Sequence, residues 1–442
     1  MAIEQGLGAG GIPDEPMVED NTRMMELPDL LPEVPGVTEL DDGSVIVGEY
    51  EEEGEPVEEI EFEGNLADVM DEGDLNDISS SLVGSIEDDL SARSEWEDTY
   101  KKGLEFLGMK TEERSEPFEG SSGVIHPLLA ESVTQFQAQA YREMLPSSGP
   151  VRSQVVGAQN EILVKQAERV KDYMNYMITY EMEEYDPEMD QMLFYLPVIG
   201  STFKKVYFDP LKGRAVSKFI HAEDIIVPYG ASDFASSPRI THRLSMDSNE
   251  IRKLQLAGFY RDIDLPSDSE GSDSSMDEVE ESIDDIQGIH PSGPSEELTL
   301  YEVHTSLDID GFEDLGADGE PTGLKLPYIV TVIADSGDVL SVRRNYDPMD
   351  PMKRAKQYFV HYKFLPGLGF YGLGLTHMIG GLAQASTSIL RQLIDAGTLS
   401  NLPAGFKARG ARIRDEDSPL QPGEFRDIDV VGGTLQGSLM PL

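Results

Sequence analysis

Residues 363 to 374 read Lys-Phe-Leu-Pro-Gly-Leu-Gly-Phe-Tyr-Gly-Leu-Gly, and a long stretch of periodic apolar residues follows them. Glycine reaches positive φ without steric cost, so the chain can turn sharply here before a helix begins. From Leu375 to Leu399, mostly apolar residues recur at alternating spacings of four and three. This spacing is typical of the seam along which one helix packs on another. The predicted seam residues are Leu375, Ile379, Leu382, Ile389 and Leu393.

The other positions of this predicted helix give it two unlike sides. Gly380, Gly381, Ala383 and Ala385 leave room for another helix to approach closely. The opposite face is polar and is predicted to be solvated, and it holds Gln384, Thr387, Ser388, Arg391 and Asp395. At about 1.5 Å per residue the helix is roughly 38 Å long, which is more than a small core needs. It is either repeated around a ring with its polar face lining a channel, or an ordinary amphipathic core helix, which the periodicity alone favours.

The glycines also match a nucleotide-binding pattern. Gly367, Gly369 and Gly372 fit the dinucleotide fingerprint, follow a strand-like run at 358–362 and precede the helix. The fingerprint needs a tight turn from strand to helix and an acidic partner for the ribose. Pro366 interrupts the approach, and Asp395, about where the acidic partner belongs, is on the helix. The match is therefore weak, and a nucleotide-binding enzyme that uses these glycines is kept as the alternative function.

The acidity of the chain is concentrated in two segments. The formal net charge is −50 over 442 residues; residues 1–75 hold 24 acidic residues and one basic residue, and residues 262–297 hold 13 acidic residues and no Lys or Arg. Such segments cannot bury enough apolar surface to offset the entropy of ordering, so residues 1–75 and roughly 264–296 are predicted to lack packed structure. The charge of the rest is modest, so a nucleic-acid partner would meet the folded body.

Several classes of function lack support in the sequence. There is no cysteine, hence no disulfide framework or thiolate zinc site, and the seven histidines show no metal-ligand spacing. The N-terminus does not resemble a signal peptide, and no apolar run is long enough to span a membrane. No nucleophile elbow, P-loop or zinc-protease motif occurs. We therefore expect no catalysis, no cofactor, no metal and no membrane partner.

The periodicity along the chain predicts an α+β fold. Helices are expected at 82–103, from His126-Pro127 to Pro146, and at 159–185, the last with Ile162, Val170, Tyr173, Met174 and Met177 toward the core. A hairpin is expected at 201–220, a strand at 239–244 followed by a short helix, and further strands at 298–307, 328–334 and 339–344. Short strands are expected within 402–442.

Ordered short motifs resemble those of the portal proteins of tailed bacteriophages, most closely those of short-tailed phages. They are Tyr-Phe-Asp-Pro at 207–210, His-Ala-Glu-Asp-Ile-Ile-Val-Pro at 221–228, Thr-His-Arg at 241–243, Tyr-Phe-Val-His-Tyr at 358–362, Leu-Gly-Phe-Tyr-Gly-Leu-Gly at 368–374 and Leu-Ser-Asn-Leu-Pro-Ala-Gly at 399–405. The resemblance covers about Leu82 to Leu442. It implies a portal fold: a tail at 1–80, a wing of helices and mixed sheet at 81–364 with an acidic loop at 262–297, a stem helix at 365–400 and a small α/β clip at 401–442. Portal proteins of this type continue into a second long helix, so the chain is expected to lack that C-terminal part.

The resemblance also implies a non-enzymatic function in the virion. Portal subunits form a ring of about twelve copies at one capsid vertex, assembled in the host cytoplasm, and the ring passes double-stranded DNA during packaging and ejection. The implied partners are other copies of the chain, the terminase, a tail adaptor, and capsid and scaffolding proteins. Arg391 on the stem, and Lys407, Arg409, Arg412 and Arg414 after it, are the candidates for channel or clip contacts. Each could instead be surface charge or part of an ion pair between subunits.

Overall fold

The computed structural model describes residues 61–109, 114, 121–157, 160–210, 212–266, 277–288, 297–316, 319–367 and 369–401, with the short strand segments 37–39, 45–47, 405–407, 412–413, 428–429 and 439–441. The chain divides into two compact units, Met1–Glu59 and Ile60–Leu442. In the first unit, strand β1 (Val37–Glu39) pairs antiparallel with β2 (Val45–Val47). Everything below concerns the second unit.

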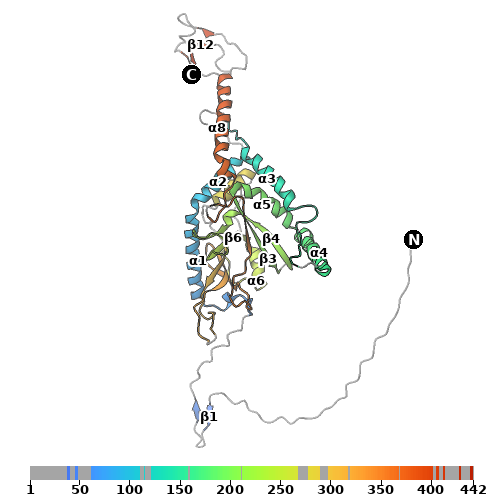
Figure 1. Ribbon diagram of the computed structural model, residues 1–442. Helices are drawn as coiled ribbons and strands as arrows, with labels where there is room; N and C mark the ends of the chain where they lie inside the picture. The colour runs from blue at the N-terminus through green and yellow to red at the C-terminus, as the bar shows by residue number, and fades with distance from the viewer. Residues whose placement is uncertain are drawn as a thin grey trace, which may run out of the picture. The chain divides into compact units, whose positions relative to one another are not determined.

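The α-helices described in this unit vary widely in length (Figure 1). They are α1 (Glu72–Ala92), α2 (Ser94–Leu107), α3 (Leu128–Met144), α4 (Glu161–Tyr176), α5 (Tyr185–Ile199), α6 (Ser248–Leu256), α7 (Asp277–Gln287) and α8 (Leu375–Asn401). Short 3₁₀ turns lie at η1 (Leu66–Asp68) and η3 (Ala222–Asp224), and the π-helical turn η2 (Met177–Glu181) continues α4. The predicted helix at 375–399 is confirmed as α8.

Two antiparallel sheets accompany the helices, and the chain is α+β. The larger sheet has the order β5-β6-β7-β8-β9, and its strands are Ile225–Ile226, Arg239–Asp247, Glu297–Leu307, Leu326–Ile333 and Val339–Arg344. The smaller sheet has the order β10-β3-β4, with strands Phe359–Lys363, Ser201–Asp209 and Arg214–Ile220. All described pairings are antiparallel. A mixed sheet contains both parallel and antiparallel pairs, so the expectation of one in the wing is wrong. Neighbouring strands run in opposite directions, and no described connection is a parallel crossover.

Four short strands are described after α8. They are β11 (Gly405–Lys407), β12 (Arg412–Ile413), β13 (Ile428–Asp429) and β14 (Leu439–Pro441). β11 pairs antiparallel with β14, and β12 pairs antiparallel with β13. The expectation of short strands in this region is confirmed.

The folded part begins earlier than the predicted boundary near residue 80. Leu66 is fully buried and Leu75 is 1% exposed, and both pack with the large sheet. Asn65 fastens this segment to the edge strand β9, because its side chain accepts a bond from Val342 N (2.9 Å) and donates one to Leu340 O (3.2 Å). The disorder predicted for residues 61–75 is wrong, because a helical spacing of apolar residues runs through the acidic ones. Of residues 1–60, only the two strands of the first unit are described.

The prediction of disorder within the acidic segment 262–297 is also partly wrong. Helix α7 lies inside this segment, and Val279 is 1% exposed in the same core as Leu104 of α2 and Val133 of α3. Ile283 and Ile286 pack against that core, so α7 buries one apolar face. Residues 267–276 and 289–296 lie outside the described residues.

The helix predicted at 159–185 forms as α4 and η2, but the described residues of the chain do not cover its predicted core face. Ile162 is 63% exposed, Val170 54% and Tyr173 60%, and α4 has no buried residue. Met174 is 43% exposed. The periodicity identified an apolar face correctly, but no described part of the same chain covers it.

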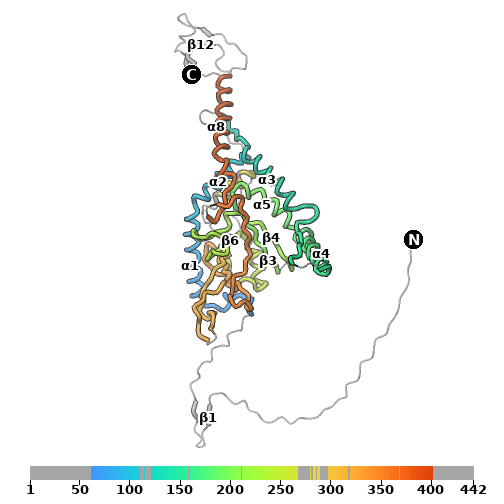
Figure 2. Tube along the Cα trace, in the orientation of Figure 1, coloured from blue at the N-terminus to red at the C-terminus, as the bar shows by residue number. Residues whose placement is uncertain are grey.

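Helix α8 lies beside helices that are distant in sequence. The trace in Figure 2 brings the chain from 94 to 107, in α2, alongside the start of α8, and α3 and α5 also contact α8. No described helix is both long and apolar enough to cross a membrane. Helix α2 meets α8 at Thr376 and Gly380, in the first two turns of α8.

Candidate assembly surface on the long helix

The base of α8 is fixed by close packing of small residues. Thr376 donates a hydrogen bond from its hydroxyl to Val198 O (2.7 Å), and it also lies against Gly103 of α2. Gly380 lies under the ring of Phe106. A Cβ atom at Gly103 would stand 2.7 Å from the Thr376 hydroxyl, so α2 and α8 approach this closely only because glycine is present.

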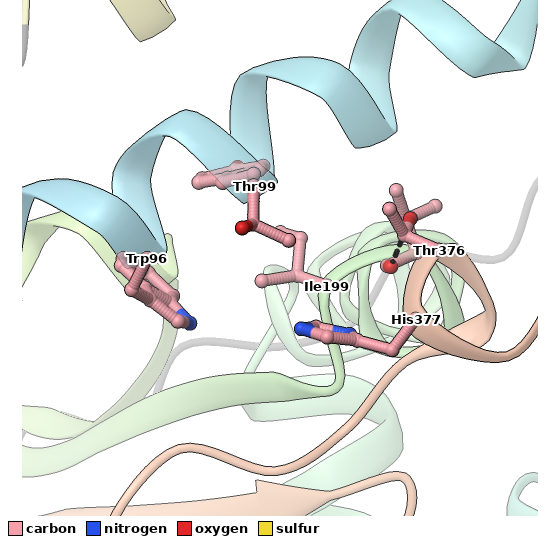
Figure 3. A pocket seen from close by; sticks show the side chains of 7 residues that line it. Trp96, Thr99, Ile199, Thr376 and His377 are labelled. Atoms are coloured by element: carbon pink, nitrogen blue, oxygen red, sulfur yellow. Dashed lines mark hydrogen bonds between the residues drawn. The ribbon is translucent and has the colours of Figure 1, made fainter. Parts of the chain in front are cut away.

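A hollow beside this contact is too small for a ligand. Figure 3 shows Trp96, Thr99, Ile199, Thr376 and His377 gathered around it, with the bond from Thr376 drawn as a dashed line. The hollow has no room for a water molecule. The neighbourhood of Trp96 is therefore packed core.

The polar face of α8 is bonded to its own chain. Thr387 accepts a hydrogen bond from His126 N (3.1 Å), Arg391 donates from Nε to Val124 O (2.7 Å), and Asp395 accepts from Ser122 N (2.7 Å). These three side chains are spaced four residues apart, so they lie along one side of the helix. The expectation that this face is solvated is wrong at these positions. The segment 121–126 covers them, and their side chains satisfy its backbone groups.

The predicted seam residues fall into two groups. Leu375 and Ile379 are partly buried and pack on the core that includes Phe203 and Phe370. Leu382 is 63% exposed, Ile389 66% and Leu393 69%, and Met378 continues the same exposed stripe. At 100° per residue this stripe lies opposite the face that holds Thr376, Gly380 and Ala383, which are buried within the chain. The second half of the seam is therefore apolar surface that the described chain leaves uncovered.

The candidate DNA contacts are placed only in part. The guanidinium of Arg391 is engaged with the carbonyls of Val124 and Gly123, so the structure already gives this side chain a role in holding the chain together. Lys407 and Arg412 belong to β11 and β12, but nothing about their side chains is described. Arg409 and Arg414 lie outside the described residues. The proposed contacts of these four residues stay predictions.

The glycines before α8 serve backbone packing. A Cβ at Gly372 would lie 2.4 Å from Gly200 O, and a Cβ at Gly374 would lie 2.4 Å from Val198 O. The amide of Gly372 donates to Ser201 Oγ (2.7 Å), and that of Gly374 donates to His377 Nδ1 (3.2 Å). The dinucleotide fingerprint instead needs amides that are free to hold a pyrophosphate, after a parallel strand. Here the preceding strand, β10, is antiparallel to β3.

Arg93 is a buried residue that the sequence analysis did not identify. It lies at the break between α1 and α2, where the sequence predicted one continuous helix. Its guanidinium pairs with Glu97 (2.8 Å) and donates to Ile225 O (2.8 Å), Glu223 O (2.5 Å) and the hydroxyl of Tyr371 (3.1 Å). Tyr371 also stacks on Trp96, with ring centroids 4.2 Å apart. Arg93 thus connects the first two helices, the large sheet and the segment that leads into α8.

A half-buried ion pair connects the two sheets. Lys205 of β3 lies 2.6 Å from the carboxylate of Glu302 in β7, and His304 Nε2 lies 2.8 Å from the same carboxylate. Burial alone would raise the pKa of Glu302, but Lys205 and His304 hold it well below its ordinary value. Burial lowers the pKa of nearby His242 to about 3. The carboxylate therefore stays charged and paired, which is the behaviour of a structural ion pair.

A second buried carboxylate lies close to Arg93. Glu223 is 5% exposed, and burial, with a smaller effect from Asp224, raises its pKa to about 7. His221 Nδ1 lies 4.0 Å from Glu223 Oε1, and burial lowers the pKa of this histidine. Among the described residues no group of histidines and carboxylates is arranged to hold a metal ion.

The strongest functional feature of the described chain is thus a surface, the exposed stripe Met378, Leu382, Ile389 and Leu393 on a helix that its own chain holds firmly by the other side. Comparison with protein-family models and with curated proteins finds no match for the chain.

Proposed function

We propose that the chain is a portal subunit of a tailed bacteriophage, one copy of a ring through which double-stranded DNA enters and leaves the capsid. The observation that carries this proposal is the exposed apolar stripe of α8, formed by Met378, Leu382, Ile389 and Leu393. Apolar stripes of this length on soluble proteins mark contacts with other proteins. A seam spacing on a long helix suits contact with a neighbouring helix, and repetition of that contact around an axis gives a ring.

The order of the described parts supports the same proposal. An α+β body of residues 61–363 precedes α8, and short paired strands follow it. This is the order of wing, stem and clip that the sequence resemblance implies. At about 1.5 Å per residue the 27 residues of α8 span roughly 40 Å, and they would form the wall of the conduit.

The charge of the chain suits passage of DNA rather than its retention. Proteins that grip DNA tightly neutralise many phosphates with Lys and Arg. This chain has 34 Lys and Arg residues against 84 Asp and Glu. Among these four residue types, α8 contains only Arg391 and Asp395. A wall of this kind would let the duplex slide. The terminase, the tail adaptor, and the capsid and scaffolding proteins would bind outside the channel.

Measurement of the assembly mass tests the proposal most directly. The purified chain should form a discrete ring of about twelve copies in native mass spectrometry, and negative-stain images should show a central hole. A chain that stays single at every concentration, and whose melting temperature rises on addition of a dinucleotide, would overturn the proposal in favour of the nucleotide-binding alternative at Gly367, Gly369 and Gly372. The bonded amides around Gly372 do not favour that outcome.

A further inference from the structure

Helix α4 is almost without contacts inside the described chain. None of its residues is buried, and it is anchored near its C-terminal end, where the side chain of Asn175 accepts from Val151 N (2.9 Å) and donates to Val151 O (3.2 Å). Isolated helices of about 15 residues are marginally stable in water. A helix of 16 residues that lacks tertiary cover therefore needs a partner to be well ordered.

The exposed surface of α4 has the pattern of a docking face. Ile162, Tyr173 and Tyr176 lie along one side of α4 at helical spacing, Val170 lies beside them, and Tyr180 follows in η2. Tyr176 and Tyr180 stack with ring centroids 5.7 Å apart, and Tyr180 is 74% exposed. Exposed tyrosines and aliphatic side chains in one stripe are typical of the centre of a protein interface.

The charge on α4 indicates what the partner is. The chain as a whole carries a formal charge of −50, and α1 and α7 each hold six acidic residues and no basic one. In contrast, α4 holds three acidic and three basic residues, and α8 holds one of each. They are the only described α-helices whose charges balance. Two copies of so acidic a chain repel one another unless they meet at balanced surfaces.

We propose that α4 docks on a second copy of this chain, with Ile162, Val170, Tyr173 and Tyr176 against the neighbouring subunit. This inference rests on the proposed ring, because a ring joins two different patches of each copy at every contact. The stripe on α8 is one apolar surface for such contacts, and α4 is a second, separate one. The docked helix would become ordered only upon assembly.

A cross-linking experiment identifies the occupant directly. The chain has no cysteine, so Tyr173→Cys gives a single thiol that can carry a benzophenone photo-cross-linker. Copies labelled with ¹⁴N and ¹⁵N are mixed before assembly, irradiated and digested. We expect cross-linked peptides that combine the two labels, and their sequences locate the surface that α4 meets. If the yield of cross-links between the two labels is no higher than that from a thiol at an unrelated exposed position, the docking is overturned.

A pair of variants separates this inference from the proposed function. Val170→Asp places a charge in the docking face, and Lys171→Gln changes the net charge equally on the side of α4 opposite Ile162, where Lys171 is paired with Asp172. We expect Val170→Asp to raise the concentration needed for assembly at least tenfold, and Lys171→Gln to leave it within about twofold. Equal assembly of Val170→Asp and the parent chain would overturn the docking and leave the ring intact. If the chain forms only assemblies smaller than a ring, and Val170→Asp weakens them, the docking is supported and the proposed ring is overturned.

Discussion

The backbone amide of Ser122 donates a hydrogen bond of 2.7 Å to the carboxylate of Asp395, which lies 273 residues later in the chain. Thr387 likewise accepts from the amide of His126, and Arg391 donates to the carbonyl of Val124, so the three side chains fix an extended segment along α8. Buried or partly buried backbone groups must find such partners when no strand or helix supplies them.

The first prediction concerns this set of bonds. Asp395→Ala removes the acceptor of the Ser122 amide, and we expect it to lower the stability of the local structure by about 1–3 kcal/mol. Hydrogen exchange at residues 121–126 should become faster, while exchange in the large sheet stays unchanged. Gln392→Ala is the control, because Gln392 is exposed and makes none of these three bonds. Equal exchange in both variants would show that the bond contributes little.

The second prediction concerns the apolar stripe. Leu382→Asp places a charge on the stripe, which is costly if assembly buries it without a partner. We expect rings to be lost while the circular dichroism spectrum of the chain is kept, because Leu382 is 63% exposed in the single chain. Gln384→Asp introduces the same charge on another exposed face and should assemble normally. Global unfolding of Leu382→Asp would instead identify α8 as an ordinary core helix.

The third prediction concerns the glycines. Gly372→Ala would place a Cβ 2.4 Å from Gly200 O, a distance that the backbone must move to relieve. We expect a loss of roughly 2 kcal/mol or more in stability, seen as a lower melting temperature. Gly369→Ala meets nothing within 4 Å and should be neutral. If both glycines formed a nucleotide cradle, both variants would change nucleotide binding, which the same melting assay can measure with added dinucleotide.

The fourth prediction concerns pH. The pKa of Glu223 is about 7 in the folded chain, above its ordinary value of 4.5, so the folded state holds this proton more tightly than the unfolded state. The contribution of Glu223 to stability is therefore lost as pH rises from about 4.5 to about 7. Glu223→Gln removes this loss, and we expect the variant to gain at least about 2 °C in melting temperature relative to the parent chain between pH 5 and pH 8. A difference that does not change with pH would contradict the raised pKa.

The fifth prediction concerns the basic residues after α8. Replacement of Lys407, Arg409, Arg412 and Arg414 by Gln should leave the assembly mass unchanged and weaken binding of the terminase or the tail adaptor in a pull-down, because charged surface residues act mainly on recognition and association rate. Unchanged partner binding, together with a large and salt-dependent loss of duplex binding, would assign these residues to DNA instead.

Local periodicity predicted the bounds of α8 and the strands of both sheets, apart from the two-residue strand β5, because each of these elements has a regular apolar pattern of its own. The predictions failed in the two acidic segments, where the acidic composition was given more weight than the spacing of the apolar residues. Leu66 and Leu75 lie in the first acidic segment and Val279, Ile283 and Ile286 in the second, and all of them are part of the core. Their spacing was visible in the sequence and could have identified both helices.

Other features could not be read from local patterns. An apolar face on α4 and a polar face on α8 were both visible, but which face the chain covers depends on segments far away in sequence. Thr387, Arg391 and Asp395 look like solvated residues until the segment at 121–126 is placed beside them. Arg93 gives no sequence signal, because its four partners come together only in the folded chain.

The bonds from α8 to residues 122–126 also fix the rotation of the helix about its own axis. The apolar stripe therefore points in a set direction before any neighbour arrives. In a ring, a small angular error at one contact repeats at every contact, and the accumulated error decides whether the ring closes or opens into a spiral. Three side chains within the subunit fix the rotation of α8, so every subunit would present its apolar stripe at the same angle to its neighbour. Closure of the ring would then depend on the structure of the single chain as much as on the interface.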